Sequence, residues 1–311
     1  MALWQQVAAQ PADAVGELLA QDVRLARVAD RLLAANGALC RQWMPVAGMV
    51  FHSSDQYSVE DARGRFVNGS IEVAFVLPGS PAAAAGIQPG DGILTIGDTP
   101  TSALRAEGEA PLRDAAFDAV ARAWPGEGPL ALALMRGAEE RRVSLSPQKG
   151  CKALTEIRTR DSLSARSDGR VIQLDYGLVA AASEEDLAVI FAHELAHVVL
   201  EHRRRLDAAG VEKGFFGEFG RNQRLNRQVE VEADRLTVHL LANAGFDPQS
   251  APTFWEGALA RRAASGLNLT YPSNSARKVL IEREIADYLP TRSGPTFPGH
   301  LLARRDQPFA R

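Results

Sequence analysis

The 311-residue chain has little cysteine, few aromatic residues and no long apolar run. Its two cysteines are too few for the disulfide framework of a small secreted domain, although they suffice for one bridge. No stretch approaches about 18 consecutive apolar residues, so no membrane span is expected in this sequence. The first 23 residues hold no Lys or Arg, which excludes the basic start of a signal peptide but leaves removal of an earlier leader open.

An excess of positive charge is also missing, because 35 basic side chains face 38 acidic ones and the formal net charge is −3. Proteins that bind nucleic acid usually need a strongly basic face, so we expect no nucleic-acid partner. At about 100–200 residues per domain, the length predicts two domains with enough chain to bury a core. The composition favours an ordinary globular protein over a disordered or fibrous one.

Short predicted strands separated by turns occupy residues 69–148. The most informative stretch, 79–100, reads GSPAAAAGIQPGDGILTIGDTP. Ser80 and Pro81 are typical of a helix start, and Gly86 lets the chain turn out of that helix. The stretch resembles the PDZ domains attached to bacterial proteases, which bind extended peptides by adding a strand to a sheet edge.

The role of this PDZ-like block stays open at the level of sequence. Residues 65–69 are the only candidate for the carboxylate-gripping loop that usually precedes the first strand of a PDZ domain. A peptide-binding domain and a domain used for packing or docking are therefore both consistent with the sequence.

The motif with the clearest chemistry is an HExxH pattern at residues 193–197, inside a helix predicted over residues 184–204. The i, i+4 spacing puts His193 and His197 on one face, where both rings can hold one metal ion with Glu194 beside them. Such a short motif also arises by chance on surface helices. The rest of this helix is apolar, however, and burying two His and a Glu without partners would cost stability.

A second pattern, ExxAD, follows on the next predicted helix at residues 230–234. A catalytic zinc usually has three protein ligands and an open position, and two His with one Glu are a known set. Glu230 can complete that set, while Asp234, one turn further on, can accept the outer N–H of a ligating His. A structural zinc is disfavoured because such sites usually have four ligands and are rich in Cys.

HExxH followed by ExxAD resembles the HtpX/BepA-type zinc metallopeptidases, the family that also includes the CAAX prenyl proteases. The resemblance covers the chain outside the PDZ-like block. It implies one Zn²⁺ per chain, held by His193, His197 and Glu230, with Glu194 as general base and Asp234 in support. Zn²⁺ would lower the pKa of its bound water to about 7, and Glu194 would carry the proton to the leaving amine.

The same resemblance implies two further elements. A segment ahead of the HExxH helix aligns substrate as an edge strand; the matching stretch is 163–173, where Ser164 replaces the usual Asn. Further on, a His-Pro followed by an Arg is frequent, but here Tyr271 stands in place of that His. Tyr271 is thus a candidate for oxyanion stabilisation or for a structural role, and Arg277 for pairing with Asp234 or with substrate.

Two segments near the motif have a simpler interpretation. The stretch 214–220 has three Phe among three Gly, and both a flap around Phe215 to Phe219 and an ordinary core-packing loop fit it. The basic run 202–205 ends the predicted HExxH helix, where positive charge suits the helix dipole. We expect its side chains to be solvated.

Cys40 and Cys151 flank the PDZ-like block. If the block is an insertion, its two ends lie close together, and a bridge would contribute about 4–5 kcal/mol in the chain-entropy model. A bridge would imply an oxidising compartment, whereas two free thiols would suit a cytosolic enzyme. The sequence leaves both open.

We therefore predict an α+β, zincin-like and mostly helical metallopeptidase with a small sheet, split into residues 1–68 and 149–311 by a PDZ domain of β-sandwich or barrel-like form at 69–148. The expected function is a zinc metalloendopeptidase that acts on peptides or unfolded proteins in quality control, in the periplasm or another exported location, with a cytoplasmic one left open. The alternative is a non-catalytic or autoinhibited PDZ adaptor or chaperone that binds client proteins.

Overall fold

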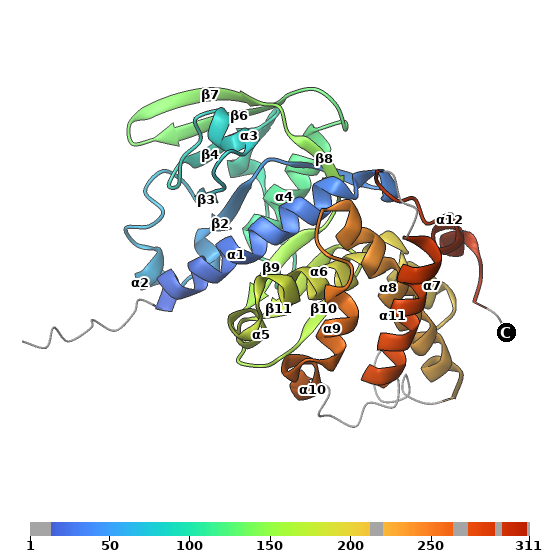
Figure 1. Ribbon diagram of the computed structural model, residues 1–311. Helices are drawn as coiled ribbons and strands as arrows, with labels where there is room; N and C mark the ends of the chain where they lie inside the picture. The colour runs from blue at the N-terminus through green and yellow to red at the C-terminus, as the bar shows by residue number, and fades with distance from the viewer. Residues whose placement is uncertain (1–13, 212–219, 264–272, 290–293, 310–311) are drawn as a thin grey trace, which may run out of the picture.

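The computed structural model describes residues 14–211, 220–263, 273–289 and 294–309. Two separate hydrophobic cores divide these residues into a helical body and a smaller β-rich unit. In Figure 1 the β-rich unit lies above the long helix α1, and most other helices lie below it. No helix in the described part of the chain is long and apolar enough to cross a membrane.

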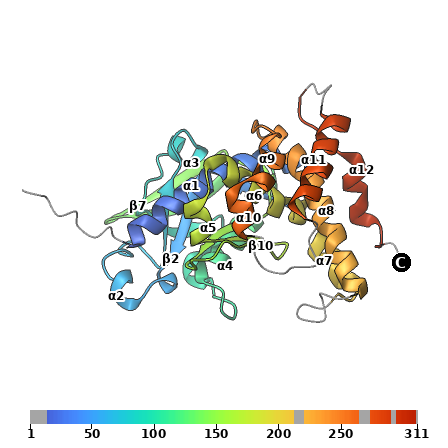
Figure 2. The same cartoon turned by 60° about the horizontal axis from the view of Figure 1, so that its bottom comes forward.

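The helical body combines the start of the chain with the sequence that follows the β-rich unit. Helix α1 packs against α6, and α8 packs against both α6 and α11, so that α6 is enclosed (Figure 2). The elements of the body are α1 (Ala14–Ala35), β1 (Trp43–Val46), β8 (Gln148–Cys151), β9 (Leu154–Arg158), β10 (Ala165–Ser167), β11 (Val171–Asp175), α5 (Tyr176–Ala181), α6 (Glu184–Val199), α7 (His202–Ala208), α8 (Gly220–Asn243), α9 (Ser250–Glu256), α10 (Ala258–Ala263), α11 (Asn274–Tyr288) and α12 (Gly299–Leu302).

The β-rich unit is an antiparallel sheet in the order β2-β3-β4-β6-β7, with β5 paired to β4. Helix α4 packs on β2, β3 and β4, which buries Ala116 and Val120 in the core of the unit. The elements are β2 (Met49–Ser53), α2 (Val59–Ala62), β3 (Ile71–Val76), α3 (Pro81–Ala84), β4 (Gly92–Ile96), β5 (Thr99–Pro100), α4 (Leu112–Ala123), β6 (Leu130–Arg136) and β7 (Glu139–Leu145).

Strand β2 corrects the domain boundary expected at residue 69. Met49 pairs with Val76 and Ser53 with Ile71, so β2 belongs to the same sheet as β3. The sequence around residues 46–52 is strand-like, but it does not show that the strand belongs to this sheet, because a long connection, residues 54–70, separates it from β3. The loop that precedes the first strand of the sheet is therefore 47–48, and not the stretch 65–69.

A narrow neck joins the two units. Strand β1 leaves the body and β8 returns to it, and the two pair antiparallel, with Trp43 opposite Cys151 and Val46 opposite Gln148. At this neck Cys40 and Cys151 form a disulfide, with their Cα atoms 5.4 Å apart and a sequence separation of 111. The bridge left open by the sequence is thus present in the structure.

The small sheet of the body has the order β10-β11-β9, so β10 is an edge strand among the described strands. Strands β9 and β11 run parallel, while β10 pairs antiparallel with β11. Both β10 and β11 pack against α6. The stretch 163–173, expected to supply an edge strand beside the HExxH helix, contains β10.

Helix α6 is shorter than the helix predicted over 184–204. It ends at Val199, and Glu201 adopts a left-handed backbone with φ of 52° before α7 starts at His202. A left-handed residue cannot continue an α-helix, so the chain changes direction here. The turn brings the start of α7 back toward the HExxH motif.

Candidate metal centre

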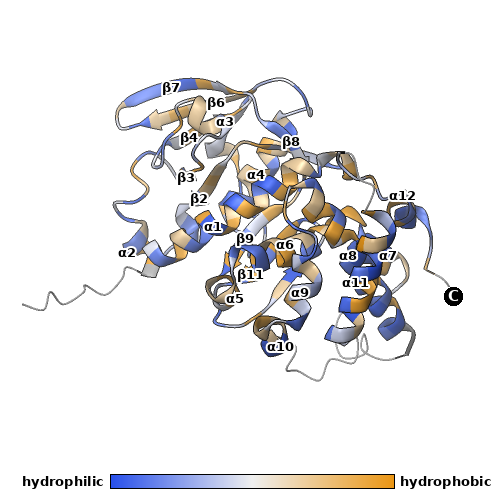
Figure 3. Ribbon diagram, in the orientation of Figure 1, coloured by the Kyte–Doolittle hydropathy of each residue, from blue (hydrophilic) through white to orange (hydrophobic). Residues whose placement is uncertain are grey.

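The HExxH motif lies on α6, a helix whose start is fixed by its own side chains. The Ser183 hydroxyl accepts a hydrogen bond from the Asp186 backbone N–H, and the Asp186 carboxylate accepts one from the Ser183 N–H. This reciprocal pair satisfies two N–H groups that a helix start leaves free. The helix beyond it is almost wholly buried and hydrophobic (Figure 3), so its polar residues at 193, 194 and 197 stand out.

Helix α8 brings Glu230 to the two histidines. The Nε2 atoms of His193 and His197 lie 3.2 Å apart. Glu230 Oε2 is 3.2 Å from His193 Nε2, and its Oε1 is 3.6 Å from His197 Nε2. One potential ligand atom from each residue lies within 4.8 Å of the other two. The three residues selected from the sequence therefore converge.

The donor set fits a divalent metal ion. Two imidazole nitrogens that face each other at 3.2 Å can share at most one proton between them, and a carboxylate stands at the same point. Two His with one Glu match the ligands of catalytic zinc sites, and the separations suit ligands arranged around one ion. Although burial alone lowers the pKa of His193, the Asp234 and Glu230 carboxylates raise it to about 10, so this position strongly favours positive charge.

Asp234 and Arg277 stand behind His193. Asp234 Oδ1 lies 3.2 Å from His193 Nδ1, the ring nitrogen that points away from His197. Arg277 donates two hydrogen bonds to Asp234, from Nε at 2.7 Å and from Nη2 at 2.6 Å. Of the two roles open for Arg277, the structure shows the pairing with Asp234. A carboxylate in this place orients a ligating ring, and the guanidinium holds the carboxylate.

Glu194 is buried beside the ligands. It is only 9% exposed, and burial raises the pKa of its carboxyl to about 7. The neighbouring His193 partly opposes this shift, whereas Glu230 adds to it. A carboxyl poised near neutral pH can both take up and release a proton, which is what a general acid–base needs.

The second histidine, His197, is oriented by His202, which belongs to the basic run 202–205 that the sequence predicts to be solvated. His202 Nδ1 lies 2.9 Å from His197 Nδ1, and His202 Nε2 lies 3.2 Å from Glu232 Oε2. Arg205 donates to the same Glu232 oxygen. His202 and Arg205 are buried, so the expectation of a solvated basic run is wrong for both. The left-handed break at Glu201 causes this burial, and the sequence contains no periodic signal that predicts the break.

Two of the sequence predictions lie outside the described residues. Tyr271 falls in the stretch 264–272, and the Phe-rich segment around Phe215 to Phe219 falls in 212–219. Both stay predictions.

A second group of two His and one Glu was not selected from the sequence. His239 on α8, Glu284 on α11 and His300 on α12 also place three potential ligand atoms within 4.8 Å of one another. Glu284 Oε1 lies 3.1 Å from His239 Nε2 and 2.7 Å from His300 Nε2. Arg235 donates to the other oxygen of Glu284 at 2.6 Å.

Comparison with known proteins supports both units. The family model of the PDZ domain matches residues 52–110, so the chain contains a PDZ domain. Mitochondrial metalloendopeptidase OMA1 of Schizosaccharomyces pombe is 29% identical over 140 residues, which cover 39% of this chain and 42% of that protein. A Vibrio cholerae protein named as a beta-barrel assembly-enhancing protease is 29% identical over 182 residues, covering 48% of this chain and 38% of that one.

The matches thus span less than half the length of these two relatives. Among solved structures, the HtrA3 PDZ domain bound to a phage-derived ligand (FGRWV) is 24% identical, with a TM-score of 0.25, and the match covers 35% of this chain and 89% of that one.

Proposed function

We propose that the chain is a zinc-dependent metalloendopeptidase of the HtpX/BepA type. The observation that carries the proposal is the convergence of His193 Nε2, His197 Nε2 and the Glu230 carboxylate at one point beside the buried Glu194. The names of the relatives, which describe metalloendopeptidases and a protease, support the same reaction class.

The proposed reaction is hydrolysis of a peptide bond. A Zn²⁺ held by the three residues would polarise the scissile carbonyl and make water more acidic. Glu194 takes the proton from the attacking water at a carboxylate oxygen and gives it to the leaving nitrogen. Asp234 and His202 keep the two rings turned toward the metal, and the edge strand β10 would align an extended substrate next to α6.

The proposed setting is an oxidising, exported compartment, where the enzyme would act on unfolded proteins. The Cys40–Cys151 disulfide supports this setting, because reducing compartments rarely preserve a structural bridge. Mass spectrometry after alkylation would test it: we expect no alkylated thiol unless the protein purified from its host is reduced first. Full alkylation without a reductant would contradict the proposed setting.

The activity is tested with Glu194→Gln, which keeps the shape of the side chain and removes its basicity. We expect the variant to bind one zinc per chain and to cleave an unfolded casein substrate about 10²–10⁴-fold more slowly than wild type. Glu185→Gln, an exposed position on the same helix, is the matched control and should leave the rate unchanged. Equal cleavage by the Glu194 variant and the wild type, or a protein without bound zinc, would favour a non-catalytic PDZ adaptor instead.

A further inference from the structure

The PDZ domain has the groove in which such domains take peptides, between a strand edge and a helix. Strand β2 is the last strand of its sheet, so its outer edge pairs with no other described strand. Helix α4 runs beside it, and the Arg113 backbone N–H donates to Ser53 Oγ at 3.0 Å where β2 ends. PDZ domains bind peptides as an added strand at an edge of this kind.

Helix α1 of the helical body closes this groove. A cavity of about 120 Å³ remains between α1, the edge of β2 and α4. Because α1 lines this cavity opposite Met49, Val50 and Phe51 of β2, a peptide strand added to β2 would meet α1. The residues of α1 that face the cavity are Asp22, Leu25, Ala26, Ala29, Asp30 and Leu33.

One residue of α1 occupies the place of a peptide carboxylate. Asp30 and Gly48, the residue directly before β2, both line this cavity. Burial raises the pKa of the Asp30 carboxyl to about 7, and the Gly48 backbone N–H opposes the rise. Backbone N–H groups in front of a binding strand are the groups that capture a terminal carboxylate. Asp30 therefore stands beside a donor that a peptide ligand would need.

No larger residue fits at Gly48, the residue that carries this N–H group. Its φ of +71° lies in the left-handed region, and a Cβ atom would lie 2.2 Å from the Cβ of Ser80. Close contact and backbone conformation thus both require glycine at the start of β2.

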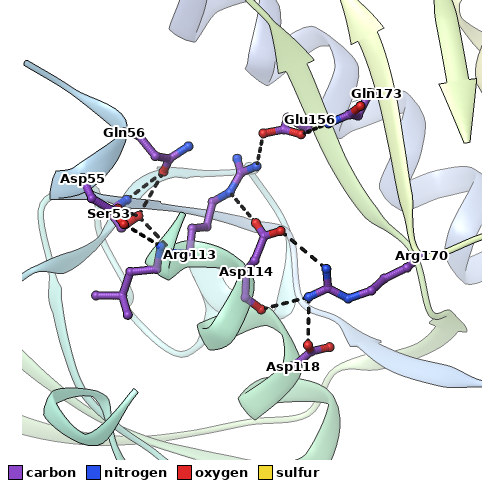
Figure 4. A network of polar contacts seen from close by, with 10 residues as sticks. Ser53, Asp55, Gln56, Arg113, Asp114, Asp118, Glu156, Arg170 and Gln173 are labelled. Atoms are coloured by element: carbon purple, nitrogen blue, oxygen red, sulfur yellow. Dashed lines mark hydrogen bonds and ion pairs between the residues drawn. The ribbon is translucent and has the colours of Figure 1, made fainter. Parts of the chain in front are cut away.

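Ion pairs join α4 of the PDZ domain to the helical body (Figure 4). Arg170 Nη2 lies 2.8 Å from Asp118 Oδ2, and Arg170 Nη1 lies 3.5 Å from Asp114 Oδ2. Lys152 Nζ lies 3.4 Å from the other oxygen of Asp118. In the same cluster Arg113 Nη2 lies 3.3 Å from Glu156 Oε1 on β9. Two cations of the body therefore converge on Asp118 of the PDZ domain.

We propose that the chain occupies its own PDZ groove with α1, through Asp30 at the Gly48 N–H, and that the ion pairs at Asp118 hold this closed arrangement. A peptide can then pair with β2 only when the interface opens, so peptide and α1 compete for one surface. The proposal concerns the groove and stands whether or not the metal centre hydrolyses peptides.

Hydrogen exchange tests the closure without any ligand. Asp118→Arg places a third cation between Arg170 and Lys152 and should open the interface. We expect amides of β2 and of the groove-facing side of α1 to exchange about tenfold faster than in wild type, while β3 and β6 keep their rates. Glu139→Arg, the same charge change at an exposed position on β7, is the matched control and should exchange like wild type.

Wild-type exchange of β2 in the Asp118 variant would overturn the proposal. If β3 and β6 also exchange faster, the Asp118 variant has unfolded the domain, and the test then uses hydrogen exchange of Asp30→Ala. Removing this carboxylate should speed exchange at the Gly48 and Met49 amides by about tenfold, and unchanged rates there would equally overturn it.

Competition is tested by peptide capture. The probe is a pool of hexapeptides that end in Val with a free carboxylate, alongside the same pool amidated, and captured peptide is counted by mass spectrometry. Asp118→Arg should capture at least tenfold more of both pools than wild type does. Asp30→Ala should gain only for the free-carboxylate pool. Equal capture by wild type and an exchange-open Asp118 variant would show that α1 does not occupy the binding surface.

Discussion

Two groups in this chain have the same composition, two His and one Glu, but differ in how their atoms face one another. At His193, His197 and Glu230 two ring nitrogens point at each other, 3.2 Å apart. At His239, Glu284 and His300 both rings point at a single carboxylate oxygen.

In the second group, an N–H on each imidazole ring can donate a hydrogen bond to Glu284, so each contact joins a donor to an acceptor. Arg235 neutralises the remaining oxygen of Glu284, and His239 Nδ1 lies 3.0 Å from Thr296 Oγ1. No proton arrangement satisfies the first group as fully, since one donor cannot serve two facing nitrogens and leave both bonded to Glu230. The comparison teaches that the direction of donors and acceptors separates a candidate metal site from an ion-pair cluster of equal composition.

The sharpest test of the comparison is removal of one histidine from each group. We expect His197→Ala to lose bound zinc and at least 10³-fold of the peptidase rate, because three ligands become two. His300→Ala should keep one zinc per chain and the wild-type rate. Metal content by plasma mass spectrometry and initial cleavage rates check both, and loss of metal from the His300 variant would make the two groups equivalent.

A smaller effect on zinc binding is expected from Asp234, which contacts the ligand His193. Asp234→Asn removes the charge next to His193 Nδ1 and should weaken zinc binding about 10–100-fold. Glu284→Gln, the corresponding change in the second group, should leave zinc affinity unchanged. Competition with a chromogenic chelator measures both affinities, and equal affinity in the Asp234 variant and wild type would deny it any role in holding the ring.

The second group should instead show its effect in stability. Glu284 is 2% exposed and is the common partner of His239, His300 and Arg235. Glu284→Gln should lower the free energy of unfolding by about 2 kcal/mol, the scale of hydrogen bonds to a charged group. Urea unfolding of the oxidised protein provides the measurement. A change below about 0.5 kcal/mol would show that the cluster is not structural.

The smallest expected effect is on the acid dependence of stability. Burial alone would raise the pKa of Glu284, but hydrogen bonds from His239 and Arg235 lower it below the usual value of 4.5. The ionised group therefore stabilises the fold above pH 4.5, and this contribution is lost as pH falls through the lowered pKa. We expect a shallower decline of stability below pH 4.5 in Glu284→Gln, measured by thermal unfolding. A decline as steep as that of wild type would contradict the assignment.

The sequence predicts the features that depend on short spacing. The two candidate ligands on α6 are four residues apart, and Glu230 and Asp234 share one face of α8. The turn residues in the stretch 79–100 predict the PDZ domain. All of these follow from the period of a helix or the geometry of a turn, which a single segment sets by itself.

The features it does not predict depend on how distant segments meet. Strand β2 is defined by its partner β3, and the burial of His202 is defined by the left-handed break at Glu201. The position of Asp30 in the PDZ groove depends on how one unit sits on the other. The strand-like character of residues 46–52 does not reveal the partner strand, and the other two features have no periodic signal within their own segments, so sequence patterns could not have found these contacts.

The disulfide at the neck also makes the PDZ domain a closed covalent ring. The chain from Cys40 to Cys151 forms a loop that begins and ends at one bond. A protease that cuts this loop once would leave both pieces joined by the disulfide, and the cut protein would gain only the mass of one water until a reductant separated the pieces. Two cuts are needed before the PDZ domain can leave the helical body, because after a single cut and reduction it is still attached through one of its two chain connections.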